Sequence, residues 1–212
     1  MKKRTRMPID ERLLDVAIEQ FGRQGLEGAS TRVIAAAART AMSSITYHYG
    51  GKEGLYLAAA RRISELITAR MGARLAQAAE PDALSPQQAV AQVTAFADGF
   101  LAMMLDPESA PWARFIVREQ MEPTPAFEVL WGQFMQAVSD YLVKLVLRAG
   151  DGRWKLAEAR VRAVALIGQV LVFRVSRATA LRVNGWEAIG APEAAEIRRV
   201  LHAHIRAILT AS

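Results

Sequence analysis

Apolar side chains recur along most of this 212-residue chain at the spacing of one face of an α-helix. Leu14, Ala17, Ile18 and Phe21 form the first such stripe, at intervals of three and four residues. No segment shows the sustained alternation of apolar and polar residues that is typical of a half-buried strand. The pattern therefore predicts an all-α protein with about nine helices and no sheet.

Glycine, proline and short polar runs divide the pattern into separate helices. The predicted helices span residues 7–24, 31–38, 43–49, 52–79, 87–105, 112–121, 126–149, 155–182 and 192–209. The first three lie within residues 1–54, and the remainder form a larger helical part. We therefore expect an N-terminal domain over residues 1–54 and a larger C-terminal domain over residues 55–212.

The stretch from Thr31 to Lys52 reads as two short helices joined by a tight turn and closed by Gly50 and Gly51. That layout is typical of a helix-turn-helix, whose second helix enters the DNA major groove. Compact polar side chains on it suit phosphate and base contacts. The predicted DNA contacts are Thr31, Arg32, Ser43, Ser44, Thr46, Tyr47, His48 and Lys52. Among them, Tyr47 and Lys52 suit phosphates better than bases. The spacing alone leaves open an ordinary surface helix pair.

Three pieces of this region resemble the DNA-binding domain of TetR-family regulators. They are LLDVAIEQFGRQGLEGAS (13–30), STRVIAAAA (30–38) and ITYHYGGKEGLY (45–56). The sequence departs from the family at Arg39, where glycine is usual in the turn, and at Ala41, where Ser or Asn usually caps the helix. We expect strain at Arg39 if its φ is positive. The missing cap costs about 1 kcal/mol, with Thr40 or Ser43 as alternative caps.

Two later stretches resemble the C-terminal domain of CecR-type members of that family. They are IVREQMEPTPAFEVLWGQFM (116–135) and LIGQVLVFRVSRATAL (166–181). The resemblance implies a domain that senses a small molecule and forms a dimer.

TetR-type regulators dimerise through their last two long helices, and apolar faces on both predicted helices allow this. The expected interface residues are Val164, Ile167, Gly168, Leu171, Val175, Ile197, Val200, Leu201, His204, Ile205 and Ile208. Residues alone leave open that both faces pack into the chain's own core. A twofold dimer would place two recognition helices about 34 Å apart on a palindromic operator.

Methionine and aromatic side chains, with three polar groups nearby, suggest a pocket for an apolar effector. The expected lining is Phe100, Met104, Phe115, Arg118, Glu119, Phe127, Trp131, Phe134, Met135, Gln169 and Phe173. An ordinary apolar core is the alternative interpretation of the same residues.

Charge and cysteine content narrow the function further. Residues 1–62 hold eleven Lys or Arg and six Asp or Glu, so most of the net charge of +6 lies in the predicted DNA-binding part. The basic arm of Lys2, Lys3, Arg4 and Arg6 suits either DNA phosphates or a solubilising tail. The chain has no cysteine, and His202 and His204 point to different helix sides, so no metal or cofactor is expected. No apolar run of about 20 residues predicts a membrane span, and a cytoplasmic protein is expected.

These observations predict a homodimeric transcription regulator, a repressor that binds a double-stranded DNA operator and is released by a small-molecule effector. The alternative is a dimeric ligand-binding or interaction protein with a weakened DNA-binding head. The sequence shows no nucleophile–base arrangement and no phosphate-binding glycine loop, so it does not indicate an enzyme.

Overall fold

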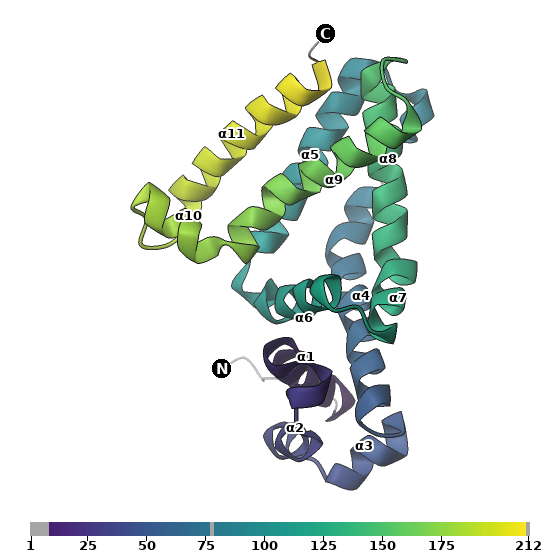
Figure 1. Cartoon of the computed structure of the whole chain (residues 1–212), viewed down its shortest axis with the longest axis vertical. Coiled ribbons are helices and arrows are strands. Elements are labelled where there is room, and N and C mark those ends of the chain that lie inside the picture. The colour runs from purple at the N-terminus through teal and green to yellow at the C-terminus, as the bar shows by residue number, and fades with distance from the viewer. Residues whose placement is uncertain (1–8, 77–78, 211–212) are drawn as a thin grey trace, which may run out of the picture. The chain divides into compact units, whose positions relative to one another are not determined.

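The computed structural model of the chain describes residues 9–76 and 79–210. These residues form helices joined by short connections and contain no strand (Figure 1). The predicted all-α class is therefore confirmed. The basic arm of Lys2 to Arg6 lies outside the described residues. The α-helices are α1 (Ile9–Gly28), α2 (Thr31–Ala38), α3 (Met42–Tyr49), α4 (Lys52–Ala76), α5 (Pro86–Leu105), α6 (Ala110–Met121), α7 (Pro125–Leu130), α8 (Gln136–Gly150), α9 (Leu156–Val175), α10 (Arg177–Asn184) and α11 (Ala191–Thr210). Short 3-10 turns, η1 (Pro81–Ala83) and η2 (Pro107–Ser109), flank α5.

The chain forms two compact units that each combine distant parts of the sequence. The first unit comprises Met1–Ala69 and Ala110–Phe134, and the second comprises Arg70–Ser109 and Met135–Ser212. The predicted boundary between a DNA-binding domain (residues 1–54) and a C-terminal domain (residues 55–212) stays a prediction. By packing, α6 and α7 belong with the N-terminal helices.

The first unit is built on α1, whose predicted apolar stripe is buried except at Leu14, which is half-buried next to the buried Leu13. Ala17, Ile18 and Phe21 are at most 1% exposed. Gly25, with φ 73° and ψ 179°, kinks the helix where it was predicted to stop, and a final turn continues to Gly28. The kink is possible because glycine adopts a positive φ without steric cost.

Helix α6 packs against α1 at close range. A Cβ added to Gly22 would lie 3.0 Å from the carbonyl oxygen of Pro111, so the two backbones approach more closely than most side chains would allow. The Tyr56 ring of α4 contacts both helices. Its centroid lies 4.8 Å from that of Phe21 in an edge-on contact and 4.6 Å from that of Phe115 in a stacked contact. Aromatic contacts of this kind stabilise a core beyond the area that they bury.

The second unit has α5 at its centre, packed against α8, α9 and α11. Val93, Ala97 and Leu101 are buried along it. Ser85 and Gln88 form a reciprocal capping box at its N-terminus. With 20 residues and a mean hydropathy of 1.3, α5 is long and apolar enough to cross a membrane. The sequence analysis predicted no such helix. A core helix of a helical bundle has the same composition, and α5 packs as one.

Two predicted long helices are interrupted. The stretch predicted as 126–149 consists of α7, a π-helical turn at Trp131–Met135 (η3) and α8. The stretch predicted as 155–182 breaks at Ser176, where α9 and α10 meet at 80° (Figure 1). Neither break coincides with a proline, so the sequence carries no strong signal for it.

Candidate nucleic-acid interface

The turn between α2 and α3 keeps the geometry that a glycine would give. Arg39 adopts φ 55° and ψ 46°, in the left-handed region. Its N–H donates to the carbonyl of Ala36 at 3.1 Å, and the N–H of Thr40 donates to that of Ala35 at 3.0 Å. These bonds satisfy the last carbonyls of α2. The expected strain is therefore present, while the turn itself is a regular helix termination.

Helix α3 begins at Met42, one residue before its predicted start. Ala41 occupies the N-cap position and provides no side-chain cap, and Thr40 instead donates from Oγ1 to Oγ of Ser44 at 3.3 Å. Ile45 is buried and Tyr49, four residues later on the same side, is half-buried, so this pair anchors the inner face of α3. Ser30 likewise occupies the N-cap of α2 without a side-chain hydrogen bond.

The outer face of α3 carries most of the predicted DNA contacts. Ser43, Thr46, Tyr47 and His48 are exposed and Ser44 is half-buried. Tyr47 is 86% exposed, with its ring edge-on to His48 at 4.9 Å. On α2, Arg32 is exposed and Thr31 is half-buried. The helix thus offers a row of hydrogen-bonding side chains to solvent.

One exposed residue of α3 was not in the predicted set. Met42, the first residue of α3, is 56% exposed. Sequence reasoning selected hydrogen-bonding side chains and passed over an apolar one at the same end of the helix. Its position after the turn was the signal that could have found it.

Lys52 is partly engaged within the chain. Its Nζ donates to the carbonyl oxygen of Glu27 at 2.8 Å. An ammonium has three donors, so this bond positions Lys52 and leaves capacity for an anion.

Two close contacts fix the helix-turn-helix in place. A Cβ at Gly54 would lie 1.6 Å from the carbonyl oxygen of Tyr49, so only glycine allows α4 to start against the end of α3. Arg12 of α1 donates from Nε to the carbonyl oxygen of Ala38 at 2.6 Å, at the end of α2. The recognition helix is thereby held by both of its neighbours.

A buried carboxylate links α4 to the end of α6. Glu119 is 0% exposed and accepts a hydrogen bond from the Tyr56 hydroxyl at 2.6 Å. The backbone N–H of Thr124 donates to its other oxygen at 3.0 Å, and the Thr124 hydroxyl is 2.9 Å from that oxygen. Burial, and then the bond to Glu119, raise the pKa of Tyr56 well above its ordinary value. The cluster is a structural joint within the first unit.

Three residues of the predicted pocket make contacts within the first unit, and their role in a pocket stays a prediction. Phe115 and Glu119 are fully buried in the first unit, where they contact Tyr56. Arg118 lies against α1, where its Nη1 would be 3.0 Å from a Cβ on Gly25. These three side chains are committed to internal packing, because α6 faces the N-terminal helices.

The remaining predicted pocket residues divide between the units. Phe127, Trp131 and Phe134 belong to the first unit, with Phe127 and Trp131 stacked at 6.4 Å. The second unit contains Phe100, Met104, Met135, Gln169 and Phe173. Of these, Met104 is buried, and the Oε1 atom of Gln169 is 3.1 Å from Nδ1 of His204. Gln169 therefore joins α9 to α11.

The predicted dimer residues separate into an inner and an outer set. Ile197, Leu201 and Ile205 are at most 5% exposed and lie in the core of their own unit. The other predicted interface residues form a second apolar stripe on α9 and α11, which faces away from the core of the unit. We call this stripe the outer face. Its exposed members are Val164, Gly168, Val175, Val200 and His204, and its half-buried ones are Ile167, Leu171 and Ile208.

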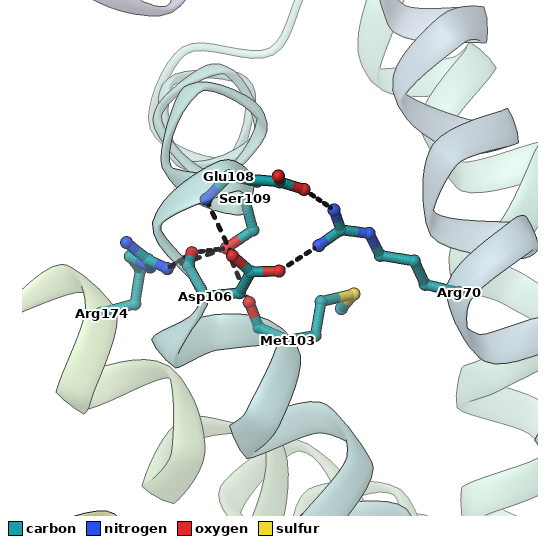
Figure 2. A network of polar contacts seen from close by, with 6 residues as sticks. All are labelled: Arg70, Met103, Asp106, Glu108, Ser109 and Arg174. Atoms are coloured by element: carbon teal, nitrogen blue, oxygen red, sulfur yellow. Dashed lines mark hydrogen bonds and ion pairs between the residues drawn. The ribbon is translucent and has the colours of Figure 1, made fainter. Parts of the chain in front are cut away.

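A polar network holds the connection between α5 and α6 within the second unit (Figure 2). Arg70 donates to Asp106 and to Glu108, each at 2.6 Å. Arg174, in the last turn of α9, donates to the carbonyl oxygen of Asp106 at 2.6 Å and to Oγ of buried Ser109 at 2.8 Å. The backbone N–H of Glu108, and after it Arg70, lower the pKa of Asp106 against the opposing effect of burial. Ser109 is the last residue of this network, and α6 begins at the next residue, Ala110.

Comparison with known proteins agrees with this architecture. Residues 13–59 match the family of bacterial regulatory proteins called the tetR family, and residues 89–212 match the C-terminal domain of the HTH-type transcriptional dual regulator CecR. The dual regulator CecR of Shigella flexneri is 30% identical over 210 residues, which cover 94% of this chain and 90% of that protein. The HTH-type transcriptional repressor AcnR of Corynebacterium efficiens is 26% identical over 153 residues, covering 70% of this chain and 71% of AcnR.

Among solved structures, AibR in complex with isovaleryl coenzyme A and operator DNA superposes with a TM-score of 0.67. It is 18% identical and the superposition covers 93% of this chain and 97% of AibR, which shows the shared fold. The fold and the helix-turn-helix thus define an all-helical transcription regulator. The chain belongs to the TetR family, in the group with a CecR-type C-terminal domain. The matched family consists of bacterial regulatory proteins.

Proposed function

We propose that this protein is a cytoplasmic, ligand-responsive repressor that binds a palindromic operator as a homodimer and releases it when a small molecule binds. The observation that carries the proposal is α3, whose polar side chains face solvent while Ile45 anchors it in the core. A recognition helix requires this combination of a rigid support and a free polar face. The related AcnR is named a repressor, which favours repression.

The proposed DNA contacts come from three helices. Arg32 and Thr31 of α2 flank the exposed side chains of α3, and Lys52 opens α4. Ser43, Ser44, Thr46 and His48 are the candidates for base edges. Tyr47 and Lys52 are proposed to contact phosphates, because phosphate contacts set register without reading sequence.

The proposed dimer forms through the outer face of α9 and α11. Val164 and Val175 are 70% and 55% exposed, and no atom lies within 4 Å of a Cβ placed on Gly168. Exposed valines beside an open glycine allow close approach of a second helix. Burial of such side chains against a second copy is favourable at about 25 cal/mol per Å². A test of this interface is Val164→Lys, with Val183→Lys on exposed α10 as control, measured by light scattering. We expect the first variant alone to become monomeric.

The proposed effector is a small apolar molecule that contacts Phe100, Met104 or Phe173 of the second unit. Methionine and aromatic side chains adapt to varied apolar shapes. Because α6 packs with the DNA-binding helices, a change in the α5–α6 connection would reach α1 through backbone contacts such as the one at Gly22. The effector would then favour a dimer whose two heads no longer match the half-site spacing.

The experiment that tests the proposal is selection of DNA from a random-sequence pool, followed by footprinting of the selected duplex. We expect an inverted repeat with half-sites one helical turn apart. Failure to enrich any sequence would favour the second candidate, a dimeric ligand-binding protein with a weakened head. The uncapped start of α3 at Ala41 is the feature that favours this candidate. Screening apolar molecules for release of the selected duplex would then test the effector.

A further inference from the structure

Met42 presents an apolar side chain at the end of the recognition helix that first meets base edges. It is the first residue of α3 and is 56% exposed, while Ile45, one turn later, is buried. Residues three apart lie on one side of a helix, so Met42 continues the side of Ile45 toward the turn, where it stays more than half exposed. Its neighbour Ser43 is exposed and polar. More than half of the surface of this methionine is therefore open to a partner.

In helix-turn-helix proteins the N-terminal residues of the second helix contact bases in the major groove. The one apolar group that base pairs display there is the C5-methyl group of thymine. A flexible thioether side chain suits contact with a methyl group, because methionine adapts its shape and has no hydrogen bond to satisfy. Guanine, cytosine and adenine instead offer donors or acceptors that methionine leaves unpaired.

We infer that Met42 is a specificity-determining residue that selects thymine in each operator half-site by contact with its C5-methyl group. This inference rests on the proposed function, since it names a base that the proposed recognition helix reads. It also adds direct apolar readout to an interface otherwise composed of polar side chains. Because the minor groove displays no thymine methyl, the contact fixes this end of α3 in the major groove.

Replacement of thymine by deoxyuridine tests the inference, because it removes the methyl group and preserves base pairing. Each thymine of one half-site in the selected duplex is replaced in turn, and affinity is measured by fluorescence anisotropy. One replacement should weaken wild-type binding about fourfold, as expected for loss of one buried methyl-sized group. Met42→Ala should bind the thymine and deoxyuridine duplexes equally at that position, and Met42→Leu should keep the preference.

The matched control is Met121→Ala, an exposed methionine at the end of α6 and outside the helix-turn-helix, with 78% exposure. It should show the same fourfold preference as wild type. A selected half-site without thymine, no sensitive thymine, or an unchanged preference in Met42→Ala would each overturn the inference. Those outcomes still include selective binding to the selected duplex. Absence of any selective binding would overturn the proposed function as well, so the two failures are distinguishable.

Discussion

The Tyr56 hydroxyl on α4 lies 2.6 Å from Oε1 of Glu119 on α6, and both side chains are buried. The two residues are 63 positions apart in sequence. Their hydrogen bond joins the segment that follows the helix-turn-helix to a helix of the CecR-type region. The N-terminal helices therefore fold together with part of the region that was expected to sense the effector.

Removing that hydroxyl should destabilise the first unit. Tyr56→Phe leaves a buried carboxylate with one donor fewer, and hydrogen bonds to charged groups contribute about 1.5–3 kcal/mol. We expect a loss of that size in the free energy of unfolding, measured by urea denaturation. Tyr47→Phe is the control, because Tyr47 is 86% exposed and its hydroxyl should contribute little to stability. Equal stability of the two variants would contradict the role of the Tyr56–Glu119 bond.

A methyl group at Gly54 should disrupt the start of α4. It would lie 1.6 Å from the carbonyl oxygen of Tyr49, and a backbone atom cannot yield as a side chain can. We expect Gly54→Ala to lose at least about 3 kcal/mol of unfolding free energy, at the upper end of overpacking effects. Gly132→Ala provides the comparison, because nothing lies within 4 Å of its Cβ and alanine favours helix. Near-wild-type stability of Gly54→Ala would show that α3 and α4 meet differently.

Glycine at position 39 should stabilise the turn. Arg39 has φ 55°, and a left-handed conformation costs a non-glycine residue roughly 1–2 kcal/mol. Glycine loses about 0.5–1 kcal/mol more backbone entropy on folding, so the expected net gain for Arg39→Gly is about 0.5–1 kcal/mol. Ala36→Gly, within α2, should instead lose about 1 kcal/mol. Thermal unfolding of both variants measures the difference, and a loss in both would refute strain at Arg39.

The lowered pKa of Asp106 predicts a pH-dependent contribution to stability. Its carboxylate accepts from the N–H of Glu108 and pairs with Arg70, so folding favours the ionised form. The contribution is fully present above the ordinary pKa of about 3.9 and is lost as pH falls through the lower folded value. Urea unfolding from pH 7 to pH 2 should show a constant advantage of wild type over Asp106→Asn that shrinks below about pH 4. An advantage that grows in acid would contradict this sign.

The sequence predicted the helices better than their breaks and their faces. Periodicity located α1 to α6 within a few residues because glycine, proline and Ser85 mark their ends. It missed the bend at Ser176 and the π-turn at Trp131–Met135, which depend on packing with no local signal. It also could not separate the two apolar stripes of α11, since a buried Ile205 and an exposed Val200 look alike in sequence.

The residues of the candidate site likewise differ in how far local sequence patterns predict them. The DNA-contact residues of α3 follow from helix spacing and chemistry, and their solvent-facing positions agree with that prediction. The pocket residues depended on which units α6 and α7 join, which is a long-range property. Phe115 and Glu119 were assigned to a pocket because the contacts with Tyr56 across 59 and 63 residues have no signature in the local pattern.

The central claim is tested most directly by a salt titration of binding to the selected duplex and to a scrambled one of equal length, by fluorescence anisotropy. Sequence-specific binding through phosphate contacts predicts tight and selective binding whose logarithm falls steeply with that of the salt concentration, by about 0.9 per phosphate neutralised. Lys52→Ala should weaken both duplexes alike and flatten this slope by about one contact. Equal and weak binding to both duplexes by the wild-type protein would contradict the account.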